Sequence, residues 1–221
     1  MVTFKDVREN EDIRTYIKMA DATLASMHFT EHSFAHVVRC ADVAGEILRK
    51  LGYDDRTVEL AQIAAYMHDI GNVVNRIDHA QSGAVMAFRL LDKMGMKAEE
   101  ISRVVTAIGN HDEKTAYPVN EIAAALIIAD KSDVRRSRVR PEERATISTD
   151  IHDRVNYAVE KSALDIDQEQ KKMVLYLNID EKISLISEYF EIFLERMMLC
   201  RRAADYFGAA FEVNINGTRV M

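Results

Sequence analysis

The sequence has few cysteines, prolines and glycines, and each shortage narrows the class of protein. Two cysteines, Cys40 and Cys200, are too few for a disulfide framework, so we expect a reducing compartment and a cytoplasmic protein. Two prolines and eight glycines exclude a chain rich in linkers. No apolar run approaches the roughly 18 residues of a membrane span, so no membrane partner is expected. The N-terminus has no apolar stretch after its charges, so we also expect no signal peptide.

Basic residues are outnumbered by acidic ones. The chain has 29 Lys and Arg against 36 Asp and Glu, which gives a formal net charge of −7. A general nucleic-acid coat needs a basic face, so we expect no nucleic-acid partner. Hydrophobic residues make up 48% of the 221 residues, enough to close a core. Because domains typically hold about 100–200 residues, we expect one domain, or one with an appendage.

Residues 1–150 have the patterns of a helical body. Apolar residues recur at helical spacing, as with Ile13, Ile17, Ala20 and Leu24. Five helix starts are predicted from capping residues: Asn10, Thr30, Asp54 or Asp55, Asp78, and Asn120. Two more helices are predicted to begin near Ala98 and at Pro141. Helix ends are predicted at Gly52, Gly71, Gly95 and Asn110. The run IAAALIIAD after Asn120 is apolar on nearly all sides and should be central.

Residues 151–221 differ in pattern. Alternation and β-branched or aromatic residues predict strands over Asn156–Ile166, Lys171–Asn178 and Ala210–Ile215, with a long amphipathic helix over Ile183–Phe207. Asn216-Gly217 is a turn signal. The fold class is therefore mainly α: a helical bundle over 1–150, followed by a C-terminal β-β-α-β appendage over 151–221 that can pack on it. Exposed strand edges and an apolar-faced helix make a homodimer through the appendage an expectation.

Six residues of the metal-ligating type lie at or near predicted helix ends. They are His36, His68, Asp69, His79, His111 and Asp130. Imidazole nitrogens and carboxylate oxygens suit Fe, Mn, Zn, Ni or Co, and helix bundles build such sites from facing helices. The adjacent His68 and Asp69 diverge by about 100° on a helix. Both can serve one centre if the two oxygens of Asp69 bridge two ions.

The order His…His-Asp…Asp resembles the signature of the HD-domain metal-dependent phosphohydrolases. The resemblance covers roughly residues 30–140 and is carried by HVVRCADVAGEI around His36, AAYMHDIGN around His68-Asp69, and IIADKSD around Asp130. The segments HAQSG at His79 and GNHD at His111 are similar to motifs of the dinuclear branch. That branch includes HD-GYP cyclic-dinucleotide phosphodiesterases and HD-type diadenosine tetraphosphate hydrolases.

The chain departs from these relatives at several places. It has no GYP segment, and His111-Asp112-Glu113 stands where HD-GYP proteins have His-His-Glu. The Glu-Asp pair that follows the HD helix in alarmone hydrolases of the ppGpp class is also missing. The substrate is therefore left open within the class of small, nucleotide-like phosphorylated molecules.

The resemblance implies a ligand set and a reaction. The first metal ion would bind His36, His68, Asp69 and Asp130, and the second would bind Asp69, His79 and His111. A metal-activated hydroxide would cleave a phosphoester or phosphoanhydride bond, with two divalent ions clamping the phosphate oxygens. His68, Asp69 and Lys131 are the implied catalytic residues. One metal ion, as in a mononuclear nucleotidase, is the alternative.

Other side chains are candidates for binding the substrate. His32 precedes His36 by four residues and could bind phosphate, or could simply be a surface histidine. Lys131 follows Asp130 and could contact phosphate as a point charge, or could end its helix in solvent. Arg135 and Arg138 of the segment RRSRVR could clamp an anionic substrate, although a salt-bridged surface is slightly favoured for most of these arginines.

A different class of function stays open. The helical body could be a non-catalytic metal-binding regulatory or interaction module, because a fold does not fix a function. The appendage is the feature that favours this alternative. Retention of activity and oligomeric state after truncation near residue 155 would count against an assembly role for the appendage.

Overall fold

A computed structural model describes residues 1–140 and 147–221. The helical body consists of α1 (Phe4–Glu9), α2 (Glu11–Ser26), α3 (Phe34–Lys50), α4 (Asp55–Met67), η1 (Ile70–Val73), α5 (His79–Lys93), α6 (Ala98–Gly109), α7 (Glu121–Lys131) and η2 (Arg136–Arg138). The C-terminal part consists of α8 (Ile151–Ala158), β1 (Val159–Asp167), β2 (Lys172–Ile179), α9 (Ile186–Tyr206), β3 (Ala210–Ile215) and β4 (Thr218–Arg219). The predicted fold class, mainly α with a small C-terminal α+β appendage, is confirmed.

Side-chain caps fix most helix starts. Asn10 accepts a hydrogen bond from the Ile13 N–H, and Asn120 accepts one from the Ala123 N–H. Asp54 caps α4 in the same way. The predicted cap at Thr30 is wrong, because the chain from 28 to 33 is not helical and Ser33 caps α3 instead. The prediction at Pro141 lies outside the described residues.

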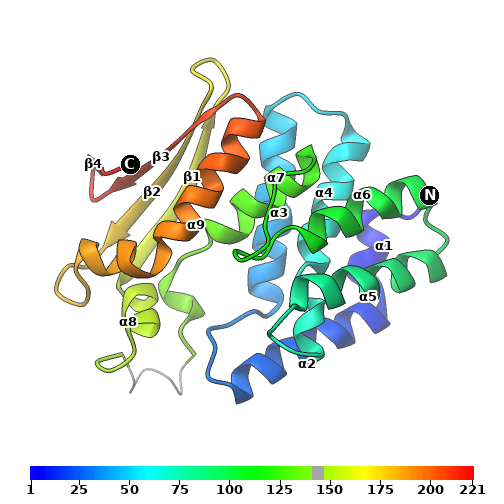
Figure 1. Ribbon diagram of the computed structural model, residues 1–221, viewed down its shortest axis with the longest axis horizontal. Helices are drawn as coiled ribbons and strands as arrows, with labels where there is room; N and C mark the ends of the chain where they lie inside the picture. Colours follow the sequence, from blue (N-terminus) through cyan, green and yellow to red (C-terminus); the bar gives the residue numbers. More distant parts are fainter. Residues whose placement is uncertain (141–146) are drawn as a thin grey trace.

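Helix α7 runs through the centre of the body, as its apolar sequence predicts. All residues from Ile122 to Ala129 are buried. Around it pack α3, α4, α6 and, from the C-terminal part, α9. Figure 1 shows α7 among these helices. A helix buried on all sides holds its end residues, Asp130 and Lys131, in a fixed place.

The C-terminal sheet has the strand order β1-β2-β3-β4. β1 and β2 pair antiparallel, whereas β2 and β3 pair parallel, and α9 makes the crossover between them. Alternate residues of β2 and β3, such as Leu175 and Val213, are fully buried. Asn216 and Gly217 both have positive φ, 52° and 83°, and form the predicted turn into β4. The sheet lies on one side of the helical body, with α9 close against it (Figure 1).

One strand prediction is wrong at its start. Residues 151–158 form α8, so the strand predicted from Asn156 begins only at Val159. Asp150 caps this helix by accepting hydrogen bonds from the His152 and Asp153 N–H groups. This local interaction favours a helix where the alternating apolar residues had predicted a strand. The helix α1 is a second element that the sequence patterns did not predict. Its capping box joins Thr3 and Asp6.

Hydrogen bonds to one carboxylate, that of Glu188, stabilise the start of α9. Glu188 accepts hydrogen bonds from the Arg154 guanidinium at 2.6 Å, the Ser184 hydroxyl at 2.8 Å and the Leu185 N–H at 3.0 Å. These hydrogen bonds lower the pKa of Glu188 to about 2. They join α9 to α8, because Arg154 belongs to α8.

Two expectations stay predictions. One is the domain boundary between residues 150 and 151, and the other is the homodimer formed through the appendage. None of the helices formed by residues 1–140 and 147–221 is long and apolar enough to cross a membrane.

Candidate metal centre

The fold brings the six predicted ligands together from five helices. His36 lies in the first turn of α3, His68 caps the C-terminal end of α4, and Asp69 follows it. His79 is the first residue of α5, His111 follows the end of α6, and Asp130 lies in the last turn of α7. These six residues are separated by up to 94 positions in sequence (36 to 130). They meet because the ends of α4, α6 and α7 converge on the starts of α3 and α5.

Asp69 lies at the centre of this cluster and presents its two oxygens to different histidines. Oδ2 is 3.2 Å from His68 Nε2 and 3.7 Å from His36 Nε2. Oδ1 is 3.5 Å from His79 Nε2 and 3.9 Å from His111 Nε2. This division matches a carboxylate that bridges two ions.

Asp130 completes the group on the Oδ2 side. Its Oδ1 is 3.3 Å from His36 Nε2 and 3.7 Å from His68 Nε2. His36, His68 and Asp130 offer ligand atoms that all lie within 4.8 Å of one another, as do those of His68, Asp69 and His111. The geometry therefore provides two overlapping sets of donors that could each hold a metal ion.

The second ring nitrogen of each histidine fixes how the ring is presented. Nδ1 of each ligand lies beside an oxygen acceptor: Asp133 Oδ2 at 2.7 Å from His36, Ala65 O at 2.7 Å from His68, Arg76 O at 3.0 Å from His79, and Ile108 O at 2.6 Å from His111. Since these oxygens accept hydrogen bonds, each Nδ1 carries the hydrogen. The four Nε2 atoms then face the carboxylates, as in histidines oriented for metal binding.

Two glycines let α5 approach η1 closely enough to place His79. A Cβ on Gly71 would lie 2.0 Å from the His79 carbonyl oxygen and 2.4 Å from the Gly83 backbone nitrogen. Asn72, in the same turn, donates to the Asp69 side chain at 2.9 Å and so orients the carboxylate. The HDIGN and HAQSG segments therefore pack backbone against backbone at Gly71 and Gly83.

Electrostatics keep the carboxylates ionised and His79 and His111 neutral, as metal binding requires, whereas His68 is protonated. Burial favours neutral Asp69 and Asp130, but the charges of His68 and Lys131, respectively, outweigh it and hold the pKa of each carboxyl well below its usual value. Burial lowers the pKa of His79 and His111, which keeps them neutral. Burial would also lower the pKa of His68, but Asp69 and Asp130 raise it to about 10. A bound cation would compete with that proton.

Two buried polar atoms lack a partner at the centre. His68 Nε2 and Asp69 Oδ2 are shielded from solvent and make no hydrogen bond. Buried polar atoms are rarely left without a partner, and such a pair fits a place where a metal ion can bind. The space left between the side chains is about 10 Å³, close to the minimum of about 10–15 Å³ that holds one water. The residues present therefore fit a divalent metal ion.

Cationic side chains surround the ligands. Lys131 is buried, and its Nζ lies 2.7 Å from Asp130 Oδ2 and 3.3 Å from Glu113 Oε1. Burial favours neutral Lys131, but these two carboxylates outweigh it and raise the pKa of Lys131, which stays charged. Arg76 and Arg196 also line the cavity, and Arg196 Nε lies 2.7 Å from Glu113 Oε1.

The predicted substrate-binding residues divide into two groups. His32, Lys131 and Arg138 line the metal cavity. Arg138 is buried, and it donates to the Glu31 and Asp133 carbonyl oxygens. Arg135 does not line this cavity. It bonds to Asp133 and lines a different cavity beside β1.

Three residues at the cavity were missing from the sequence prediction: Arg76, Glu113 and Arg196. Arg76 stands three residues before the predicted ligand His79, and this position could have suggested Arg76 as a residue of the site. Arg196 belongs to α9, about 65 residues beyond Lys131 in sequence, and no pattern places it near the ligands. The C-terminal part of the chain thus contributes a side chain to the candidate site.

Comparison with known proteins identifies the family to which this chain belongs. Residues 33–158 match the HD domain family, and the chain belongs to that family. The six His and Asp residues of the cluster, from His36 to Asp130, all lie within the matched residues.

Two individual proteins are similar to parts of the chain. The uncharacterized protein MJ1020 of Methanocaldococcus jannaschii is 24% identical over 159 residues, which are 62% of this chain and 61% of that protein. The chain thus spans about 61% of the length of this curated relative. The crystal structure of a predicted HD superfamily hydrolase from an uncultured Thermotogales bacterium shares 27% identity, with a TM-score of 0.45. That likeness covers 56% of this chain and 67% of the other.

Proposed function

We propose that this protein is a metal-dependent phosphohydrolase that acts on a small, nucleotide-like phosphorylated molecule. The observation that carries the proposal is the placement of Asp69 between two groups of histidine Nε2 atoms, with Oδ2 facing His36 and His68 and Oδ1 facing His79 and His111. Two divalent ions are proposed, the first on the Oδ2 side with Asp130 and the second on the Oδ1 side. Fe, Mn, Zn, Ni and Co all suit these donors.

The metal ions would supply Lewis-acid activation of water and charge neutralisation at the phosphate. The chain itself supplies the other positive charges. Lys131, Arg76 and Arg196 surround the ligands and can bind phosphate oxygens that the ions do not hold. Glu113 lies between Lys131 and Arg196 and so fixes the direction of both cations.

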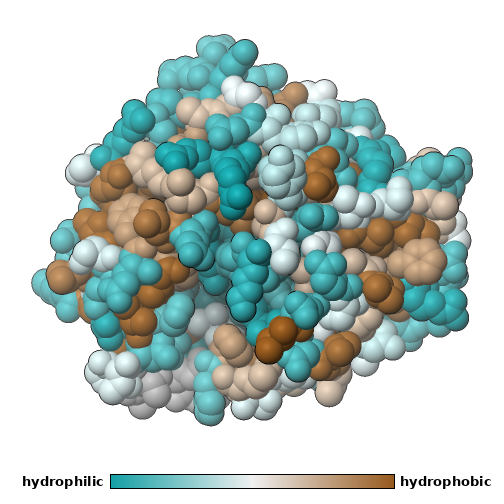
Figure 2. All heavy atoms as spheres, in the orientation of Figure 1, coloured by the Kyte–Doolittle hydropathy of each residue, from teal (hydrophilic) through white to brown (hydrophobic). Residues whose placement is uncertain are grey.

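A larger cavity next to the centre offers room for the rest of the substrate. It measures about 330 Å³ and shares Arg76, Arg138 and Arg196 with the metal cavity. Its wall includes the rings of Phe29 and Phe193, which lie 5.6 Å and 4.8 Å from the guanidinium carbons of Arg76 and Arg196. Aromatic walls next to fixed cations suit a molecule with an apolar ring and a phosphate. In Figure 2, hydrophilic side chains surround a hollow near the middle of the visible face.

The mononuclear alternative is supported by one observation. The set of His36, His68 and Asp130 could hold a metal ion without His79 or His111. A nucleotidase with one ion would use this set alone. A non-catalytic module on the same scaffold is the remaining alternative, and turnover by the purified protein would exclude it.

The test measures metal content and hydrolysis in the same preparations. Wild type and Asp69→Asn, which keeps the shape of the side chain but removes its charge, are screened with nucleoside monophosphates, nucleoside triphosphates, cyclic dinucleotides and dinucleoside polyphosphates. We expect the substitution to remove bound metal and turnover together. Full activity of Asp69→Asn at wild-type metal content would contradict the proposal, and so would the absence of turnover by fully metal-loaded wild type.

A further inference from the structure

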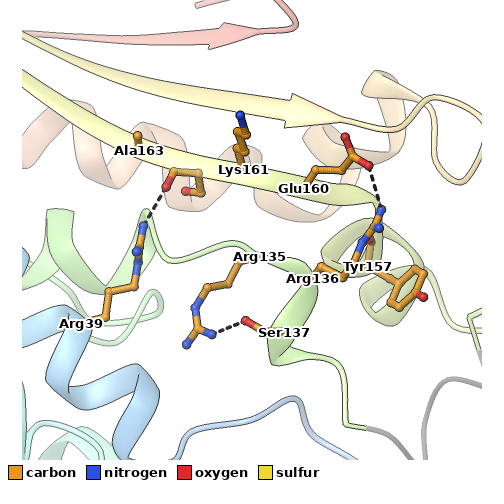
Figure 3. A pocket seen from close by; sticks show the side chains of 9 residues that line it. Arg39, Arg135, Arg136, Ser137, Tyr157, Glu160, Lys161 and Ala163 are labelled. Carbon is orange, nitrogen blue, oxygen red and sulfur yellow. Dashed lines mark hydrogen bonds and ion pairs between the residues drawn. The ribbon is translucent and has the colours of Figure 1, made fainter.

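A second cavity lies beside β1, away from the metal cavity. It measures about 680 Å³ and lies between α3, the residues of η2 and the strand. Figure 3 shows Arg39 of α3 and the consecutive residues Arg135 and Arg136 along β1. Among the described residues, none lines both this cavity and the metal cavity.

The walls of this cavity carry an excess of positive charge. Arg39, Arg135, Arg136 and Lys161 line the cavity, where Glu160 is the one acidic lining residue among those that the structure describes. Behind the wall, Asp133 pairs with Arg39 and Arg135, and Glu31 lies 3.4 Å from Arg135, so part of this charge is balanced. The whole chain, in contrast, has a formal net charge of −7. A local cluster of cations in an acidic protein attracts small anions to that place.

The guanidinium groups are held in position before any ligand arrives. Arg39 donates to the Ser162 carbonyl oxygen at 2.8 Å. Arg136 donates from Nε to the Tyr157 carbonyl oxygen at 2.6 Å, and its guanidinium carbon lies 4.7 Å from the centre of the Tyr157 ring. Arg135 bonds to Ser137. Groups fixed in this way lose little conformational entropy when a ligand binds.

One donor in the cavity wall has no hydrogen-bond acceptor. Arg136 Nη2 forms only an ion pair, with Glu160 Oε1 at 3.6 Å, which is beyond hydrogen-bond distance (Figure 3). A phosphate oxygen closer than this carboxylate would accept a charge-assisted hydrogen bond from the guanidinium group.

We propose that this cavity is a second anion site, which binds a phosphate-bearing small molecule through Arg136 and Arg135, with Lys161 and Arg39 adding charge. Arginine presents its donors in a fork that matches phosphate. The volume is that of a small-molecule site. This inference goes beyond the proposed hydrolase activity, because it does not require turnover or a bound metal.

The cavity is also joined to the metal centre through Asp133. The Asp133 side chain is fully buried, and its Oδ1 accepts from Arg39 Nε at 3.0 Å and Arg135 Nε at 2.9 Å. Its Oδ2 accepts from His36 Nδ1 at 2.7 Å. Asp133 therefore balances part of the positive charge of Arg39 and Arg135 and keeps both guanidinium groups at the cavity wall.

The first experiment is calorimetric titration of metal-free full-length protein with inorganic pyrophosphate. Arg136→Gln should weaken binding by about tenfold or more, because it removes a charge-assisted contact. Arg196→Gln, the matched change in the metal cavity, should leave this site at wild-type affinity. Equal affinity of wild type and Arg136→Gln would overturn the proposal, and so would loss of all binding in Arg196→Gln.

Amide NMR of the wild type tests the same site without a substitution. Pyrophosphate should shift the resonances of residues 135–137 and 157–163, whereas shifts confined to residues near Lys131 and Arg196 would overturn the proposal.

Discussion

Gly71→Ala tests how the turn after the HD pair places His79. A Cβ at this position would lie 2.0 Å from the His79 carbonyl oxygen, whereas real Cβ atoms essentially never approach closer than 3.0 Å. The backbones of η1 and α5 must therefore separate by about 1 Å, and such overpacking costs about 1–3 kcal/mol. His79 Nε2 is only 3.5 Å from Asp69 Oδ1, so a displacement of this size takes His79 out of the cluster.

The assay combines thermal unfolding with metal analysis. We expect Gly71→Ala to lower the free energy of unfolding by about 1–3 kcal/mol and to lose the second metal ion that we propose His79 binds. Gly109→Ala is the matched control, because its Cβ would meet Gln81 and Ala84 at ordinary contact distances of 3.6 and 3.7 Å. The control should unfold at or slightly above the wild-type temperature. If Gly71→Ala kept the wild-type stability and metal content, the reasoning about the close backbone contact would be refuted.

Three further predictions concern the surroundings of the centre. Asp133→Asn removes the charge that His36 Nδ1 faces, and it should weaken metal binding about 10–100-fold in a chelator competition. An unchanged metal affinity would show that metal binding by His36 does not depend on the Asp133 charge. Arg196→Gln should raise KM about tenfold for the substrate found in the screen, and an unchanged KM would remove Arg196 from the substrate site. Glu188 has a folded-state pKa lowered to about 2, so its stabilising effect is present above the unfolded-state value near 4.3 and is lost as pH falls toward 2. Glu188→Gln should flatten the dependence of unfolding temperature on pH between about 4.5 and 2, relative to wild type and to exposed Glu195→Gln; parallel curves for Glu188→Gln and wild type would contradict this linkage.

The sequence was most informative where local chemistry decides the structure. Caps at Asn10 and Asn120 set helix starts because a short side chain bonds to backbone N–H groups a few residues later. The central place of α7 followed from its apolar residues alone. Thr30 failed as a cap because Ser33, three residues later, makes the local hydrogen bond that begins α3.

The structure brings the six predicted ligands together, with the predicted His32, Lys131 and Arg138 beside them, and it adds side chains that no motif marks. His68-Asp69 and the other ligands stand in family motifs, which carry their identity in the sequence. Arg196 reaches Glu113 only because α9 packs on α7, and no periodicity encodes that long-range contact. Arg135 was one candidate for binding the substrate, with a salt-bridged surface slightly favoured for most of these arginines, and its bond to Asp133 turns it toward the cavity at β1.

The most direct test of the central claim is the number of metal ions per chain. Elemental analysis would compare wild type with His79→Ala, both purified without chelator or affinity metal. The arrangement of histidines around the two oxygens of Asp69 predicts close to two ions in wild type and one in His79→Ala. One ion in both proteins would contradict the bridged centre and favour the mononuclear nucleotidase.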